Sequence, residues 1–112
     1  MRTKLEVKDY HAADQYYEMR NFQAASVAFT NFNRVWPNSR FREDAMFFTF
    51  KSHYYLSVNS VESKKLERLE DAVRAYHNFA DAFPQSVLLE DANKLNKEIE
   101  AAIEKKTRTS TP

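Results

Sequence analysis

The chain has 112 residues, enough for one domain, and its 17 basic and 16 acidic side chains leave a net charge of only +1. This balance argues against a nucleic-acid-binding protein, because such proteins carry a clear basic excess. Cysteine and glycine are both absent, which excludes disulfides, thiol chemistry and glycine-rich phosphate loops and favours a helical protein.

The first third of the chain predicts two helices, over residues 4–20 and 22–36. In the first helix, the apolar members are Tyr10, Ala13, Met19 and either Tyr16 or Tyr17. In the second, apolar residues recur at alternating spacings of three and four, which places them on one stripe: Phe22, Ala25, Phe29, Phe32 and Trp36. Asn21 lies between the two helices and is the best candidate for the left-handed residue that ends the first one.

The sequence motif at the end of the second helix occurs twice in the chain. WPNSRFREDA begins at Trp36, and FPQSVLLEDA begins 47 residues later, at Phe83. Proline disfavours helical geometry in the residue before it, so each copy predicts a helix stop. The serines that follow, Ser39 and Ser86, are predicted to cap the next helix. Acidic pairs then occupy the helix start, where the helix dipole favours negative charge: Glu43-Asp44 and Glu90-Asp91.

Three further helices are predicted, over residues 40–57, 66–83 and 87–105. The helix over 40–57 carries two apolar stripes about 100° apart, which is typical of a helix held between two neighbours. One stripe is Phe47, Phe50 and Tyr54, and the other is Phe48 and Tyr55. The helix over 66–83 repeats the earlier three-four spacing with Leu69, Ala72, Tyr76, Phe79 and Phe83. The last helix has one polar face, as a terminal capping helix requires, and one apolar stripe: Leu88, Leu89, Ala92, Leu95, Ile99, Ala102 and Ile103.

The repeated spacing is that of the second half of a tetratricopeptide repeat, which reads A-x3-F and then P. It is carried by two equivalent sets of core residues: Ala25, Phe29, Phe32, Trp36 and Pro37, and then Ala72, Tyr76, Phe79, Phe83 and Pro84. The usual period is about 34 residues, so a spacing of 47 places thirteen extra residues in SVNSVESKKLERL, residues 57–69. We therefore predict an all-α, tetratricopeptide-like helical-hairpin solenoid of about two repeats plus a C-terminal capping helix, with five helices.

The chain also resembles the BamD family of outer-membrane assembly lipoproteins, in its Bacteroidetes-like branch. The resemblance is carried by Tyr16-Tyr17, Phe22, Ala24-Ala25, residues 36–47, Lys51-Ser52, Tyr54-Tyr55, residues 59–65, Glu67-Arg68, Phe83-Pro84 and Ser86. It covers roughly residues 4–100, and the insertion NSVESKKLER is its most specific part, because generic repeats have no such element.

The resemblance implies a non-catalytic scaffold of the outer-membrane β-barrel assembly (BAM) complex. Members of the family sit on the periplasmic face of the outer membrane, where they hold the barrel-forming BamA-like partner with the other lipoproteins of the complex. The family's lipidated cysteine and N-terminal repeats are not found in this sequence, so we expect it to be a C-terminal fragment, with membrane contact only through an anchor absent from this chain. Two alternatives stay open: another periplasmic tetratricopeptide adaptor for cell-envelope maintenance, and a regulatory repeat domain attached to an enzyme.

Candidate partner-binding residues lie at the end of the helix over 40–57 and in the insertion: Tyr54, Tyr55, Lys64, Lys65 and Arg68. Aromatic residues are favoured at interface hot spots, and an insertion in a repeat often lies on the binding face. The simpler interpretation is neighbour contacts for the tyrosines, and a solvated loop and helix start for the charges.

No catalytic, cofactor or metal site is predicted. His11, His53 and His77 are scattered over three helices, and none has a partner at convincing metal-ligand spacing. The acidic pairs recur at equivalent repeat positions, which favours helix-start electrostatics over acid–base catalysis.

We expect residues 1–106 to form a single helical domain and residues 107–112 to form a disordered tail. If the chain is such a fragment, we expect the helix over 4–20 to have no preceding repeat that covers its apolar face. Residues 5–20 are therefore expected to mediate concentration-dependent self-association.

Overall fold

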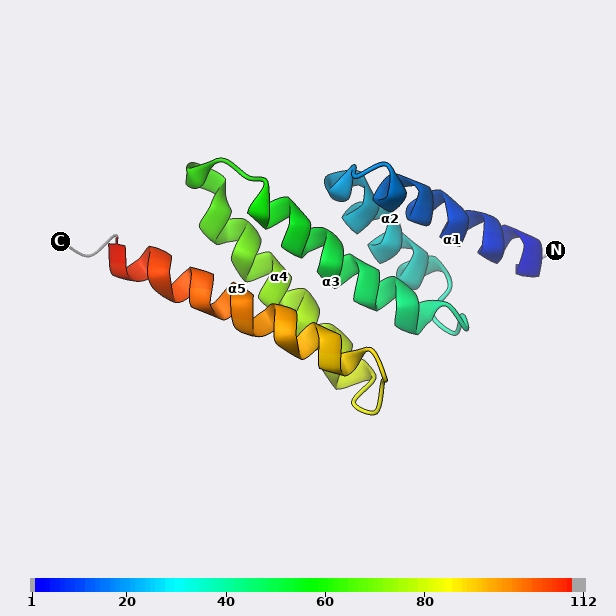
Figure 1. Ribbon diagram of the computed structural model, residues 1–112. Coiled ribbons are helices and arrows are strands. Elements are labelled where there is room, and N and C mark those ends of the chain that lie inside the picture. Colours follow the sequence, from blue (N-terminus) through cyan, green and yellow to red (C-terminus); the bar gives the residue numbers. More distant parts are fainter. Residues whose placement is uncertain (1, 110–112) are drawn as a thin grey trace.

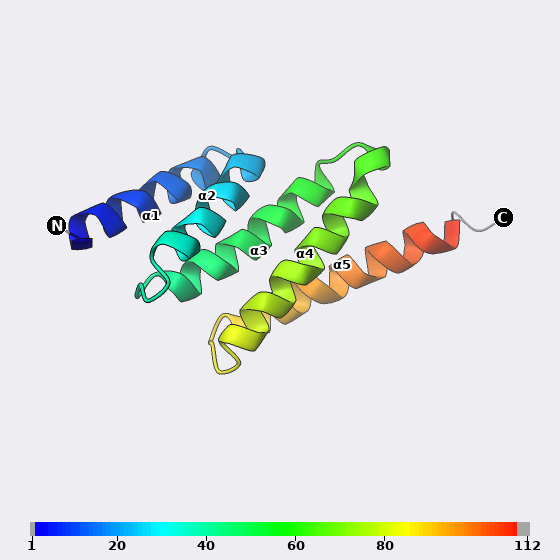
Figure 2. The same ribbon diagram turned by 180° about the vertical axis from the view of Figure 1, so that it is seen from behind.

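The computed structural model describes residues 2–109 and confirms an all-α fold built of helical hairpins (Figures 1 and 2). It has five helices in the described part of the chain: α1 Arg2–Glu18, α2 Phe22–Val35, α3 Arg42–Val58, α4 Glu62–Ala82 and α5 Leu89–Thr109. Each helix runs antiparallel to the next, and the stack is elongated, with extents of 59 × 29 × 19 Å. The two ends of the described chain lie at opposite ends of the stack.

The turn between α1 and α2 differs from the prediction at one residue. Arg20, and not Asn21, takes the left-handed conformation, with φ of 62°. Asn21 is the N-cap of α2, where its side-chain oxygen accepts a hydrogen bond from the Ala24 backbone N–H at 3.3 Å. Asparagine is common both as the left-handed residue after a helix and as an N-cap. Asn21 takes the N-cap position, because its side chain there satisfies a backbone N–H of α2 that has no partner within the helix.

The two repeated serines form equivalent joints. Ser39 Oγ accepts a hydrogen bond from the Phe41 N–H at 3.0 Å and donates one to the Glu6 carboxylate on α1 at 2.5 Å. Ser86 Oγ accepts from the Leu88 N–H at 3.0 Å and donates to the Glu43 carboxylate on α3. The serines therefore lie before the helix start rather than at the N-cap of α3, which is Phe41. Each one ties the turn to the helix that opens the preceding hairpin.

The insertion is almost entirely helical. α4 has 21 residues against 14 in α2, and it begins at Glu62 instead of the predicted residue 66. Since Leu69 corresponds to Phe22, where α2 starts, the seven extra residues add two helical turns. Only residues 59–61 connect α3 to α4. The α3–α4 hairpin thus extends beyond the α1–α2 turn, toward the C-terminal side of the stack (Figure 1).

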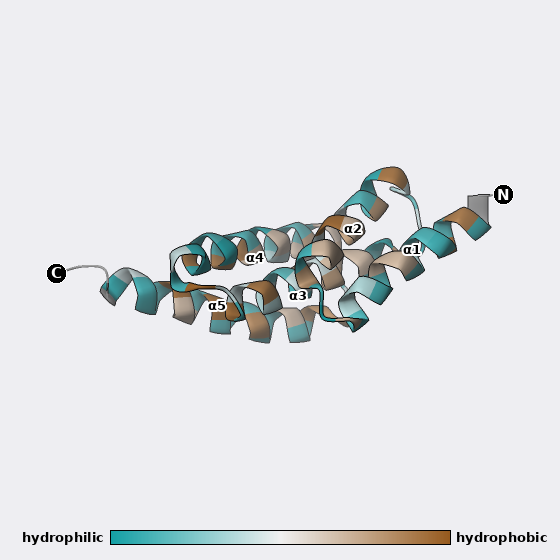
Figure 3. Ribbon diagram, turned by 90° about the horizontal axis from the view of Figure 1, so that it is seen from above, coloured by the Kyte–Doolittle hydropathy of each residue, from teal (hydrophilic) through white to brown (hydrophobic). Residues whose placement is uncertain are grey.

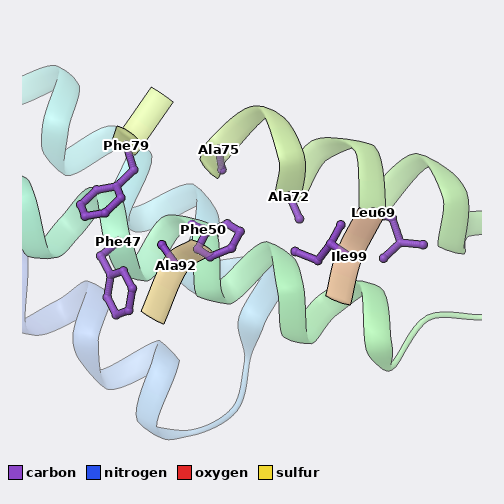
Figure 4. Packing of buried hydrophobic residues seen from close by; sticks show 8 residues of the cluster. All are labelled: Phe47, Phe50, Leu69, Ala72, Ala75, Phe79, Ala92 and Ile99. Carbon is purple, nitrogen blue, oxygen red and sulfur yellow. The ribbon is translucent and has the colours of Figure 1, made fainter. Parts of the chain in front are cut away.

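Two clusters of buried side chains form the core, and α3 contributes to both. Phe47 and Phe50 of α3 pack with buried residues of α4 and α5 (Figure 4): Leu69, Ala72, Ala75, Phe79, Ala92 and Ile99. Ala45, also on α3, packs on its other side with Ala13, Ala25, Phe29 and Phe32 of α1 and α2, and Phe48 packs against the same cluster. The predicted position of this helix between two neighbours is confirmed.

The repeat residues occupy the expected core positions, with graded burial. Ala25, Phe29, Phe32, Ala72 and Phe79 are buried. The other three ring-bearing residues of the two sets are partly buried and still pack against the clusters: Trp36, Tyr76 and Phe83. Pro37 and Pro84 lie exposed in the turns that follow α2 and α4.

The capping helix is confirmed, but its bounds differ from those predicted. Ala92 and Ile99 are buried, and the other members of the predicted stripe pack against the same cluster. α5 begins at Leu89 and continues to Thr109, so residues 107–109 are helical rather than part of a disordered tail. The rest of the predicted tail, residues 110–112, lies outside the described residues.

Candidate protein-docking site

The end of the α3–α4 hairpin presents apolar and basic side chains to solvent. We call residues 57–65 the hairpin tip. Val58 is 49% exposed and Val61 is 68% exposed, although both are branched apolar residues that normally favour burial. Lys64 is also exposed, one helical turn along α4 from Val61. Apolar and charged side chains thus lie together at this projecting end of the stack.

A groove runs from the hairpin tip along the contact between α4 and α5. It consists of two adjoining cavities of 410 and 390 Å³, and Lys65 and Leu69 line both. Tyr54 closes one end, where its hydroxyl donates a hydrogen bond to the Glu98 carboxylate on α5 at 3.1 Å. Burial and this bond raise the pKa of Tyr54. Tyr54 and Lys65, both predicted to contact a partner, therefore lie in one groove.

Two polar contacts hold the groove in shape. Lys106 Nζ on α5 lies 2.6 Å from a Glu62 carboxylate oxygen at the start of α4, and this bond lowers the pKa of Glu62. Arg68 Nη1 donates a hydrogen bond to Ser60 Oγ at 2.7 Å, across the turn between α3 and α4. Arg68, predicted as a partner contact, is half-buried and is engaged within the hairpin instead of projecting from it.

Tyr55 lies on a different side of α3 from Tyr54. Its ring stacks on Phe22 of α2, with centroids 5.0 Å apart and planes inclined by 25°, and it meets Tyr17 of α1 edge-on. Lys51 Nζ lies 6.0 Å from the Tyr55 ring centroid. The structure thus places Tyr54 and Lys65 in one groove, leaves Lys64 exposed at the hairpin tip, and holds Tyr55 in the packing between α1, α2 and α3.

The titratable residues singled out in the sequence are dispersed. His11 and His77 are exposed on α1 and α4, and His53 is half-buried on α3, where burial lowers its pKa. Within residues 2–109, no group of three or more histidine or acidic side chains is arranged to hold a metal ion. Burial and the neighbouring Glu43 raise the pKa of Asp44, while Glu43 itself accepts the hydrogen bond from the Ser86 joint.

Four residues of this surface were missed from the sequence: Val58, Val61, Lys105 and Lys106. A signal for the first two existed, because valines at 58 and 61 lie in an otherwise polar segment and belong to neither predicted apolar stripe. The two lysines lie on the last helix, and only the packing of α5 on α4 places them beside Glu62.

No protein-family model matches this chain, and a search of curated proteins finds no match. In the described range, no helix combines the length and the apolar character that crossing a membrane requires.

Proposed function

We propose that this chain is a non-catalytic scaffold that docks another protein through the hairpin tip and the adjoining α4–α5 groove. The observation that carries the proposal is the extended α3–α4 hairpin, which presents two exposed valines and Lys64 next to a groove of two cavities. Apolar side chains rimmed by charges are the composition of protein interfaces, in which the apolar centre supplies affinity and the charges supply orientation.

The recurring joints support a repeat scaffold. Ser39 with Glu6 and Ser86 with Glu43 use the same atoms in the same way at successive turns. A repeated joint fixes the angle between successive hairpins, so a partner meets a surface of defined shape. Rigid surfaces lose less conformational entropy on binding than flexible ones, which favours affinity.

The identity of the proposed partner is inferred from the resemblance to the BamD family. The segment that distinguishes this family from generic repeats, NSVESKKLER, forms the turn and the start of α4 in this chain. We infer that the chain corresponds to the C-terminal part of such a lipoprotein, works at the periplasmic face of the outer membrane, and holds a BamA-like barrel-forming protein and other lipoproteins of the assembly complex. The basic side chains at the site that form no ion pair within the described chain, Lys64, Lys65 and Lys105, favour an acidic partner surface with an apolar centre.

Capture from detergent-solubilised membranes of the source bacterium tests this proposal. The chain serves as immobilised bait, and the proteins retained are identified by mass spectrometry. The expected result is enrichment of a barrel-forming protein with periplasmic domains. Lys64→Glu combined with Lys65→Glu is expected to reduce its recovery about tenfold, because reversed charges repel an acidic surface.

Lys94→Glu combined with Lys97→Glu is the matched control. Both lysines are exposed on the polar side of α5, so the change in net charge is the same and the hairpin tip is unaltered. Recovery of the barrel-forming protein with this control should equal that with the unaltered chain. Absence of such a protein from the material retained by the unaltered chain overturns the proposal, and so does equal loss with both double variants.

A further inference from the structure

Figure 3 shows α2 and α4 on the same side of α3. A cavity lined by residues of these three helices lies away from the hairpin tip. We call it the α2–α4 groove. It measures 650 Å³, within the range of sites that bind ligands, and its floor is α3, against which α2 and α4 each pack. Nine polar side chains from the three helices line it, and six of them are Asn33, Arg34, Arg42, His53, Asp71 and Arg74.

The charges of the α2–α4 groove are unbalanced. Its one carboxylate, Asp71, is already paired with Arg74 on the same helix. Arg34 and Arg42 form no ion pair with a residue of the described chain. Arg42 instead lies over the Phe83 ring, with its guanidinium carbon 5.4 Å from the ring centroid. Two guanidinium groups from different helices thus border the cavity without a carboxylate to neutralise them.

A second, independent observation is the amide of Asn33. Its Oδ1 is buried and has no hydrogen-bond partner among the described residues. Buried polar atoms are normally satisfied, so an unsatisfied one in a cavity wall indicates a position where a donor from outside the chain fits, after a small rotation of the amide. Met46 and Ala75 provide apolar surface in the same cavity.

The geometry points to an acidic segment of a partner protein as the occupant of the α2–α4 groove. Glutamate or aspartate side chains of that segment pair with Arg34 and Arg42, because a guanidinium binds a carboxylate through two parallel hydrogen bonds. A peptide N–H of the segment supplies the donor that Asn33 lacks, and the aliphatic stems of its side chains cover Met46. This interaction is separate from docking at the hairpin tip and does not depend on it.

Fluorescence anisotropy with a fluorophore-labelled hexaglutamate peptide tests the inference on the full chain. Saturable binding is expected, and it should weaken as salt is added, as for any contact between charged groups. Arg34→Gln and Arg42→Gln should each weaken binding about tenfold, the loss expected for one charge-assisted bidentate contact. Arg34→Lys, which keeps the charge but not the paired hydrogen bonds, should give an intermediate loss.

Lys97→Gln on the exposed face of α5 is the control for net charge and should leave binding unchanged within twofold. Arg34 is itself exposed, so its replacement leaves the fold intact, and circular dichroism checks this. The inference is overturned if the unaltered chain shows no saturable binding, or if Lys97→Gln weakens binding as much as Arg34→Gln. Equally tight binding of free glutamate overturns the assignment to a peptide segment.

Discussion

Replacing Phe50 by alanine tests how much of the stability depends on the way α3 packs against α4 and α5. Phe50 is 0% exposed, and its ring centroid lies 5.8 Å from that of Tyr76 on α4. Removing a fully buried phenylalanine ring costs about 3–5 kcal/mol, the sum of the lost transfer free energy and the cavity left behind. A domain of this length has a free energy of unfolding of roughly 6–17 kcal/mol, so the loss is a large fraction of the total.

Urea unfolding followed by circular dichroism measures the effect. With a slope of about 2 kcal/mol per molar urea, the midpoint should fall by roughly 2 M for Phe50→Ala. Phe50→Leu, which keeps most of the volume, should cost about 1–2 kcal/mol and gives a readable value if the alanine variant does not fold. Val87→Ala is the control, because Val87 is 89% exposed, and it should change the stability by less than about 0.5 kcal/mol. A loss below about 1 kcal/mol for Phe50→Ala would refute the placement of this ring at the centre of the core.

Three further outcomes are expected. Ser86→Ala should lower the free energy of unfolding by about 1–2 kcal/mol because the Glu43 carboxylate loses its donor, whereas the exposed Ser63→Ala should have little effect in the same urea titration. Burial lowers the pKa of His53 below its ordinary 6.5, so just below pH 6.5 the unfolded chain binds a proton that the folded chain does not. The free energy of unfolding should therefore fall as the pH drops below 6.5. In thermal melts, His53→Gln should make this fall less steep. Sedimentation velocity should show self-association through the exposed Leu5 and Tyr16 of α1 and Met19 of the turn that follows it. Met19→Lys should weaken the association and Gln15→Lys should not; a single monomeric species up to high concentration would count against it.

The helices and their buried faces could be predicted because apolar spacing is a local property of the sequence. The series Phe22, Ala25, Phe29, Phe32 selects one helical stripe, and the structure buries all four. The start of α4 could not be found in this way. Residues 62–68 are mainly charged and show no apolar period, and they are helical in a segment that packs against α5, where Lys106 contacts Glu62.

The candidate site was predicted less completely, because it is formed by tertiary contacts. Tyr54 and Tyr55 are neighbours in the sequence, yet one turns toward α5 and the other toward α2, since successive residues of a helix point about 100° apart. Lys105 and Lys106 join the surface only through the packing of α5. The α2–α4 groove gathers arginines from three helices, Arg34, Arg42 and Arg74, and nothing local in the sequence associates them.

The most direct test of the proposed docking role is isothermal titration calorimetry of the purified chain with the periplasmic domains of a BamA-like protein, the partner that we propose. We predict saturable binding that Lys64→Glu with Lys65→Glu weakens about tenfold, equivalent to roughly 1.4 kcal/mol, and that Lys94→Glu with Lys97→Glu leaves unchanged. No binding by the unaltered chain, or binding that the hairpin-tip substitutions leave intact, would contradict the proposal that the extended α3–α4 hairpin is the docking surface.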